Sequence, residues 1–472
     1  MVSNKKTFSL PFWIIFFIEL WERYGFAGIQ VLLILFLINK LNIPETKSYI
    51  LFGTFSAFIF GFIWIGGKVG DSILGAKRTI ILGAIVLALS YISISLVDAN
   101  TVYYSLAGII IGNALFKANP ASLISKMYKD DPDMLDSAIT LYYMSINIGA
   151  FLSTLFTPFI SQLFGYKVAF VTCGLSIFIG LSVFIAFYNK ISHIATKAGK
   201  EKLNYNKLIL TILATIVSIY GVAILIKNAT ISNIIVIITL ILAVVYYFSE
   251  FKKENKESKI KMIIALLLFF EAITFFVLYN QMPSTLILFV QNNVDHSLFG
   301  YEISPAQYYI FNPLTIVIFS PILSKIYSKY HSTHATKFCM GMTFGAIAYL
   351  LLYIPQFISS TGIVSSWWVI ATYVIQSIGE LLISALGLSM MMSLCPKRIS
   401  GFVSGFWYLA TMISGPIAGW VGTLTVIDKK NISHIESIHV YGNIFGAIGL
   451  FTALVALFMW IMRPKINKFI ES

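Results

Sequence analysis

The chain has 472 residues, of which 58% are hydrophobic and only 11% charged, and its mean hydropathy is +0.84. A soluble protein of this length needs a far more polar surface, so the composition excludes that class and indicates a polytopic helical membrane protein. Its three cysteines are scattered through apolar runs, which gives neither a disulfide framework nor the spacing of a metal site. They are Cys173, Cys339 and Cys395.

Fourteen apolar stretches are near or above the ~20 residues that a membrane-crossing helix needs. The first follows Lys5 and Lys6, is too long for a signal peptide and has no small-residue cleavage site, so we expect it to be retained. The predicted spans are 8–38, 48–67, 79–97, 101–124, 136–163, 167–188, 207–227, 232–249, 261–290, 306–327, 337–357, 365–394, 400–426 and 441–463.

The basic residues are unevenly divided between the two predicted sides of the membrane. With the N-terminus inside, 25 lysines and arginines fall on the cytoplasmic side and six outside. This asymmetry follows the positive-inside rule and predicts that both termini are cytoplasmic. It also explains the net charge of +13 without a nucleic-acid partner.

Two basic segments, Lys190–Lys207 and Lys252–Lys261, flank the seventh and eighth spans. Removing that hairpin leaves six spans on each side, which resembles the major facilitator superfamily. The loop Gly67–Arg78 is similar to a glycine, aspartate and basic motif of that superfamily; its glycines allow a tight turn, and Asp71 is expected to cap a helix. We therefore predict a bundle over 1–190, linkers and a hairpin over 191–260, and a second bundle over 261–472.

Few ionisable residues lie inside the predicted spans, and three of them are adjacent in the first. A charge at the bilayer centre costs at least ~2.5–3.5 kcal/mol, so Glu19, Glu22 and Arg23 need a function or a partner. On an ideal helix Glu19 lies about 40° from Arg23 and about 60° from Glu22, so all three can face one cavity. All six histidines lie in predicted loops, which favours carboxylates as proton carriers.

Two further charges occupy equivalent positions in the two predicted halves. Lys117 lies about two-thirds along the fourth span, just before Pro120. Glu380 lies at a similar depth in the span 365–394, which is the tenth once the hairpin is left out. We expect them to face each other across the cavity, whereas internal salt bridges are the alternative. Glu271 lies nine residues before Asn280, about 180° around an ideal helix, which favours packing or an accessory role over a proton role.

Several motifs together resemble the proton-dependent oligopeptide transporter family over nearly the whole chain. The first span is similar to its Glu-x-x-Glu-Arg signature, and the fourth to its lysine-bearing helix. The other matching segments are Leu141–Ala150, Asn312-Pro313, Gly379–Ser384, Pro396–Arg398 and Gly405–Trp407.

This resemblance implies an alternating-access importer that carries di- or tripeptides with protons. It assigns proton coupling to Glu19, Glu22, Arg23 and Lys117. In the family the lysine meets the peptide carboxylate, and the glutamate of the tenth span meets the amino group. The implied substrate-binding residues are Lys117, Glu380, Tyr143, Asn147, Gln30, Asn280, Gln281, Asn312, Ser384 and Trp407.

The chain departs from the family pattern at positions that bear on the substrate. Tyr24, Phe26 and Ala27 replace the usual phenylalanine and two tyrosines, Phe60 replaces a common tyrosine, and Gln30 replaces a second arginine. Asn280-Gln281 replaces the usual glutamate-glutamine sequence. In the family this glutamate commonly pairs with the second arginine, so Gln30 and Asn280 together remove both partners of a charge pair and leave no lone charge. These changes leave open a different small polar substrate, such as an amino acid or a modified peptide.

Other classes remain as alternatives. A polytopic membrane enzyme needs a catalytic constellation, and the acidic cluster Lys129–Asp133 lacks histidine and reads better as a solvated turn. A channel or receptor gives no reason for the matched charges in the fourth and tenth spans. We expect a multi-pass protein of the inner membrane, not an enzyme, acting as a monomer in the lipid bilayer, with no metal and no cofactor beyond the proton gradient.

Overall fold

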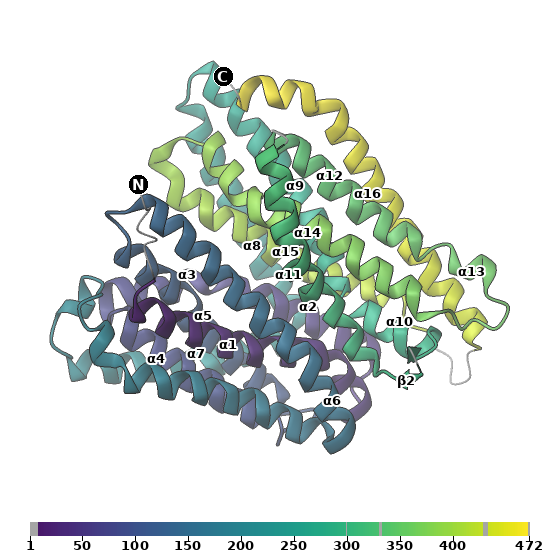
Figure 1. Cartoon of the computed structure of the whole chain (residues 1–472), viewed down its shortest axis with the longest axis horizontal. Coiled ribbons are helices and arrows are strands. Elements are labelled where there is room, and N and C mark those ends of the chain that lie inside the picture. Colours follow the sequence, from purple (N-terminus) through teal and green to yellow (C-terminus); the bar gives the residue numbers. More distant parts are fainter. Residues whose placement is uncertain (1–7, 299, 330–332, 428–432, 471–472) are drawn as a thin grey trace, which may run out of the picture. The chain divides into compact units, whose positions relative to one another are not determined.

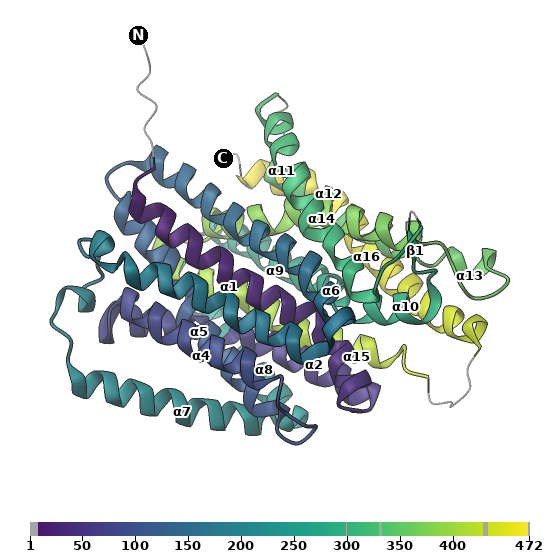
Figure 2. The same ribbon diagram turned by 60° about the horizontal axis from the view of Figure 1, so that its bottom comes forward.

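The computed structural model describes residues 8–298, 300–329, 333–427 and 433–470, and it is almost wholly helical there (Figures 1 and 2). The one sheet in this part of the chain pairs β1 (Ser297–Leu298) with β2 (Tyr301–Glu302). Eleven of the described helices are long and apolar enough to cross a membrane, which confirms the predicted polytopic helical class. The count of fourteen spans and the orientation stay predictions.

The chain folds into two compact units. Unit 1 comprises Met1–Leu32 and Phe62–Lys227, and unit 2 comprises Leu33–Gly61 and Asn228–Ser472. Residues 33–61, placed in the first predicted bundle, here group with the second unit, and the predicted hairpin is divided between the two. Compact units defined by contacts and bundles defined by repeated spans divide a chain by different criteria, so the predicted bundles stay a prediction.

In unit 1, α4 packs on α5 and α6, and α5 packs on α3 and α7. Within α6 the chain turns at Gly165, whose φ of 82° joins two helices end to end, close to the predicted break between 163 and 167. The elements are α1 (Leu10–Leu35, which leaves the unit after Leu32), α3 (Ile63–Lys68), η2 (Val69–Ile73), α4 (Ala76–Ser93), α5 (Val102–Met127), α6 (Pro132–Ala186), η3 (Tyr188–Ile191), η4 (Ala198–Lys200) and α7 (Tyr205–Lys227).

In unit 2, α2 packs on α15, α9 packs on α15 and α14, and α12 packs on α14 and α16, its neighbour in both views (Figures 1 and 2). The elements are η1 (Phe36–Lys40), α2 (Glu45–Gly61), α8 (Ala229–Lys252), α9 (Lys256–Gln281), α10 (Thr285–Asn293), η5 (Pro305–Ile310), α11 (Phe311–Lys329), α12 (His334–Leu351), α13 (Pro355–Ile358), α14 (Ser366–Leu394), η6 (Lys397–Ile399), α15 (Ser400–Thr423) and α16 (His434–Ile470).

Three local expectations are corrected. The predicted span 261–290 is broken between α9 and α10, and the predicted span 48–67 is broken at Phe62, between α2 and α3. The last helix begins at His434, seven residues before the predicted span, so His434 and His439 lie in α16 rather than in a loop. His334 likewise begins α12, and His331 lies outside the described residues. The first two turns of α16 are too polar to be recognised by hydropathy, so the predicted span began too late in the chain.

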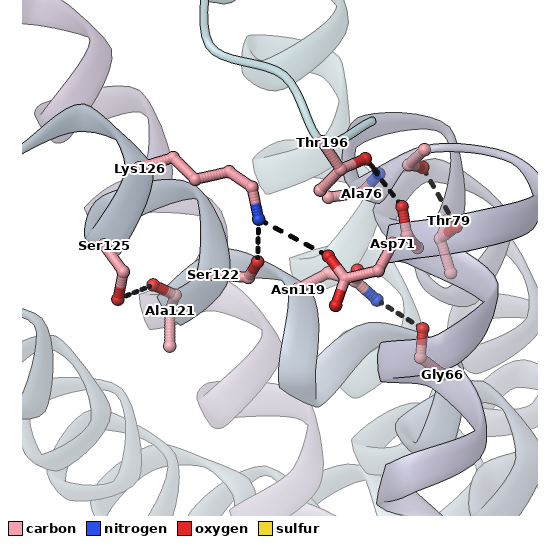
Figure 3. Close-up of polar contacts among 12 residues, drawn as sticks. Gly66, Asp71, Ala76, Thr79, Asn119, Ala121, Ser122, Ser125, Lys126 and Thr196 are labelled. Atoms are coloured by element: carbon pink, nitrogen blue, oxygen red, sulfur yellow. Dashed lines mark hydrogen bonds and ion pairs between the residues drawn. The ribbon is translucent and has the colours of Figure 1, made fainter. Parts of the chain in front are cut away.

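The predicted turn motif has a tight backbone at Gly75. Its Asp71 contacts a neighbouring helix instead of capping one (Figure 3). Gly75 has a φ of 93°, and a Cβ there would lie 2.5 Å from the Cα of Gly199, so the position requires glycine. Asp71 caps no helix; its carboxylate lies 3.4 Å from the Nζ atom of Lys126 at the end of α5. The hydroxyl of Thr196 accepts a hydrogen bond from the backbone N–H of Ala76. This bond attaches the segment between η3 and η4 to the turn.

The two hairpin helices are each anchored within their own unit. Tyr220 of α7 stacks on Tyr104 of α5, with ring centroids 6.1 Å apart. In α8, Tyr247 stacks on Phe406 of α15 at 5.3 Å, and Glu254, just beyond α8, pairs with Arg398 of η6 at 2.5 Å. The hairpin therefore packs as two separate helices rather than as one inserted body.

Helices α2 and α15 approach closely at two glycines. A Cβ atom on Gly53 would lie 2.5 Å from the carbonyl oxygen of Gly415, and a Cβ on Gly415 would lie equally close to the carbonyl oxygen of Gly53. Small residues of this kind allow helix backbones to pack closely where no hydrophobic effect drives association in lipid. By contrast, a Cβ at Gly221 in α7 meets no atom within 4 Å.

We therefore predict that Gly415→Ala destabilises the protein by about 1–3 kcal/mol, because the added methyl group collides with backbone rather than with a movable side chain. Gly221→Ala is the matched control and should unfold at or slightly above the wild-type temperature. Thermal unfolding of the purified protein in detergent, followed by tryptophan fluorescence, measures both. Equal stability of the two variants would contradict the close contact between α2 and α15.

Candidate functional site

The three charges of α1 form a buried ion cluster. Arg23 Nε contacts the Glu22 carboxylate directly and lies 3.6 Å from Glu19 Oε1. Glu19, Glu22 and Arg23 are 1%, 0% and 6% exposed. The helical spacing predicted that these side chains share one face, and their mutual contacts follow from it.

Helix α5 brings two more polar side chains to this cluster. The Asn113 amide lies 3.4 Å from Glu22 Oε1, and Lys117, one turn further along α5, interacts electrostatically with Glu19, Glu22 and Arg23. Phe26 separates the two cations: its ring centre lies 4.9 Å from the Arg23 guanidinium carbon and 5.9 Å from Lys117 Nζ. An aromatic face attracts cations, so Phe26 helps to hold both in place.

Helix α6 closes the cluster through a glycine. A Cβ on Gly149 would overlap the carbonyl oxygen of Leu20 and lie 2.9 Å from Arg23 Cβ, so only glycine lets α6 approach α1 here. Two residues earlier α6 carries Asn147, whose amide bonds the Tyr143 carbonyl at 2.9 Å, and about two turns earlier it carries Tyr142, whose hydroxyl hydrogen-bonds Glu19. The predicted residue Tyr143 is 38% exposed, whereas its neighbour Tyr142 is 8% exposed.

The cluster keeps unused hydrogen-bonding capacity. Glu19 Oε2, Arg23 Nη2 and the hydroxyl of Tyr91, a fully buried residue of α4 near Glu22 and Arg23, have no partner in the described part of the chain. If every group is ionised, the two carboxylates balance Arg23 and Lys117. Adding one proton leaves an excess positive charge. A charge-compensated cluster with unpaired donor and acceptor atoms can accommodate that proton by new hydrogen bonds.

Unit 2 holds a second, simpler site at Glu380. Asn312 of α11 donates to Glu380 Oε2 at 2.8 Å and lies 2.9 Å from the hydroxyl of Ser377 on α14. Glu380 is 8% exposed, and among the residues described no cation lies within ion-pair distance of it. A neutral amide orients the carboxylate without neutralising it, so the charge remains available to an ammonium group.

Asn280 and Gln281 contact α15. The Asn280 amide bonds the Ser414 hydroxyl at 3.2 Å, and the Gln281 amide bonds the Ala418 carbonyl at 3.1 Å. Gln281 Oε1 also accepts from the Thr285 hydroxyl at 2.5 Å. These bonds join the end of α9 to α15, and the predicted substrate-binding role of both residues stays a prediction.

The remaining predicted residues are dispersed. Trp407 of α15 is 4% exposed and packs against Phe276 and Phe338, with ring centroids 6.0 and 6.5 Å apart. Gln30 in unit 1 and Ser384 in unit 2 are both partly exposed. Lys117 belongs to unit 1 and Glu380 to unit 2, and their placement across one cavity stays a prediction.

Sequence reasoning missed four residues at these sites: Tyr91, Asn113, Tyr142 and Ser377. Asn113 and Tyr142 stand inside matched motifs, so a rule that examined every polar motif position would have found them. Tyr91 and Ser377 lie in apolar runs and give no comparable signal. No group of three or more metal-ligating side chains occurs in the described ranges.

The comparisons with known proteins agree with this chemistry. A family model described as the POT family matches residues 76–440. A dipeptide and tripeptide permease B of Photorhabdus asymbiotica is 40% identical over 471 residues, covering 98% of this chain and 96% of its own. The permease B of Salmonella typhimurium is 39% identical over 470 residues, again with 98% and 96% coverage.

Solved structures show the same fold. One, of a bacterial homologue of the human drug peptide transporters PepT1 and PepT2, superposes with a TM-score of 0.87 at 29% identity, covering 97% of this chain and 99% of that one. Tetrameric PepTSo2 gives 0.87 and 29%, with 97% and 98% coverage. These likenesses confirm the fold expected from the six-plus-six arrangement, and the chain belongs to the POT family, the proton-dependent oligopeptide transporters that its motifs resemble.

Proposed function

We propose that this chain imports di- and tripeptides together with protons across the bacterial inner membrane by alternating access. Membership of the POT family makes it a transporter rather than an enzyme. The observation that supports proton coupling most directly is the buried cluster of Glu19, Glu22 and Arg23 beside Lys117. Its relatives' names, dipeptide and tripeptide permease, support the cargo.

Coupling follows from the charge balance of that cluster. Glu22 contacts Arg23 and Asn113, and Lys117 lies in its electrostatic field. When Glu22 takes up a proton, the cluster loses one negative charge and Lys117 loses part of its compensation. A substrate carboxylate then restores the balance at lower cost than in the unprotonated state, so binding of proton and of peptide favour each other.

The two ends of the substrate have complementary candidates. Lys117 supplies a cation for the carboxylate, and Glu380, oriented by Asn312, supplies an anion for the amino group. An extended dipeptide separates its terminal charges by roughly 7 Å, so two fixed opposite charges select short zwitterions without reading their side chains. Protons supply the driving force, and the proposal needs no cofactor. PepTSo2 forms tetramers, and the monomer expected here stays a prediction.

A second candidate keeps the fold and the coupling but changes the cargo to an amino acid, a modified peptide or another small polar compound. Gln30 is neutral and Asn280 bonds Ser414 of α15, so carboxylate binding rests mainly on Lys117. One cation holds a substrate carboxylate less tightly than the two of the usual family pattern.

We predict that Glu22→Gln abolishes proton-driven accumulation of peptide and leaves counterflow exchange intact, because an amide preserves the shape but cannot bind or release a proton. Uptake of labelled di-alanine into proteoliposomes, with and without an imposed proton gradient, separates the two activities. Glu201→Gln, which changes an exposed glutamate of the same unit, should behave as wild type. Concentrative uptake by Glu22→Gln would end the coupling assignment.

Lys117→Ala should lower the initial uptake rate by about tenfold or more, because it removes the charge proposed to meet the carboxylate. The control is Lys129→Ala, whose side chain is 71% exposed beyond the end of α5. Both rates are measured by the same di-alanine assay at equal protein reconstitution. Normal uptake by Lys117→Ala would remove this lysine from the site.

The role of Glu380 is tested by a cycle of two changes, Glu380→Gln in the protein and N-acetylation of di-alanine. Each alone should weaken binding roughly tenfold or more, and the two together should cost little more than one, because both remove the same charge pair. Ligand-induced thermal stabilisation of the purified protein measures binding. Additive losses would contradict the pairing.

The same thermal assay, run with a library of peptides and amino acids, distinguishes the two candidate cargoes. Stabilisation by di- and tripeptides with varied side chains supports the proposed function. Stabilisation by amino acids alone, with no displacement of label by any peptide, supports the second candidate.

A further inference from the structure

Glu271 of α9 is a buried carboxyl group that the proposed transport cycle does not use. It is 2% exposed, and neither of its carboxyl oxygens has a hydrogen-bond partner among the described residues. Its titratable neighbour is the Cys339 thiol of α12, which also lies in the field of Arg463 on α16. No cation lies within ion-pair distance of the carboxylate in the part of the chain that the structure describes.

Glu271 lines a cavity of about 660 Å³ bounded by α9, α15 and α16. The other polar lining groups are the indole N–H of Trp420 and the hydroxyls of Thr274 and Thr452, which donate to carbonyls of their own helices at 3.3 and 2.7 Å. Glu271 is therefore the one ionisable side chain in the described lining. The volume lies within the range of small-molecule sites, roughly 300–1,000 Å³.

This combination restricts the chemistry of an occupant. The apolar walls require a hydrocarbon or aromatic body, and an unpartnered buried carboxylate is costly until a cation or a strong donor meets it. Glu271 lies about 22 Å from the start of α9 and about 15 Å from its end at 1.5 Å per residue. A phospholipid headgroup stays at the interface and does not reach that depth, so the cation must itself be lipophilic.

We propose that the α9–α15–α16 cavity binds lipophilic amines, with the ammonium group on Glu271 and the apolar body along residues such as Phe270 and Phe451. The site is distinct from the peptide site, because none of the residues assigned to substrate binding or proton coupling lines it. The occupant enters from the hydrocarbon phase of the membrane, so it need not pass through the aqueous cavity.

The test is photolabelling of the full chain in lipid nanodiscs with dodecylamine that carries a diazirine on its alkyl chain. The matched probe has the same chain and diazirine and ends in a methyl group. Mass spectrometry locates the labelled residues. We expect the amine probe to label peptides that contain Phe270 or Phe451, with competition by unlabelled dodecylamine, and the methyl probe to label them at least about tenfold less.

Glu271→Gln should reduce amine labelling to the level of the methyl probe, whereas Glu271→Asp, which keeps the charge, should retain part of it. Thr452→Val changes another lining residue without changing its charge and should label as wild type. Unchanged labelling by the methyl probe and an unchanged unfolding temperature report that each variant is folded.

Equal amine labelling of Glu271→Gln and wild type would overturn the proposal, as would labelling of wild type that does not depend on the amine. Labelling confined to α11 and α14, around Asn312 and Glu380, would assign amine binding to the peptide site and would equally overturn it. Because the readout is binding, a failure of peptide transport leaves the test unaffected.

Discussion

Charge compensation inside an apolar interior is the constraint on which unit 1 depends. Two carboxylates and one guanidinium on α1 are tolerated only if α5 supplies Lys117 and Asn113, and if α6 comes close enough to exclude water. Gly149 makes that approach possible by having no side chain where Arg23 lies. The same compensation makes the cluster sensitive to a proton, since one added proton unbalances groups that are otherwise matched. The proposed proton coupling therefore relies on the same side chains that compensate the buried charge.

Unit 2 handles buried charge differently. Glu380 is oriented by neutral partners, Asn312 directly and Ser377 through it, so no described residue cancels its charge. Further along the unit, Asn280 places an amide where the family pattern has a glutamate, and together with Gln281 it joins α9 to α15 by hydrogen bonds. The first unit thus carries a balanced set that can exchange protons, while the second carries a carboxylate suited to an external cation.

The fold class and the buried charged cluster could be predicted from the sequence, because membrane-spanning helices are strongly hydrophobic and a charged residue within one is easily recognised. The polytopic helical class and the mutual contacts of Glu19, Glu22 and Arg23 followed from those two rules. The roles of Lys117 and Glu380 stay predictions. The sequence could not choose between Tyr142 and Tyr143, since adjacent helical residues differ by 100° and only packing decides which one meets Glu19. It placed a helix cap at Asp71, where the local turn instead directs the side chain to Lys126. Nothing in the sequence distinguishes Tyr91 from the other aromatic residues of the core.

The boundary between the two units has a mechanical consequence. The chain crosses it three times, between Leu32 and Leu33, between Gly61 and Phe62, and between Lys227 and Asn228. The first crossing lies within the unbroken helix α1, whereas the second falls at the break between α2 and α3, and the third at the single residue that caps α8. A continuous helix resists bending, but one residue between two helices has free backbone dihedrals. The three connections between the units therefore differ in local stiffness: one is an unbroken helix, and the other two are single residues between helices.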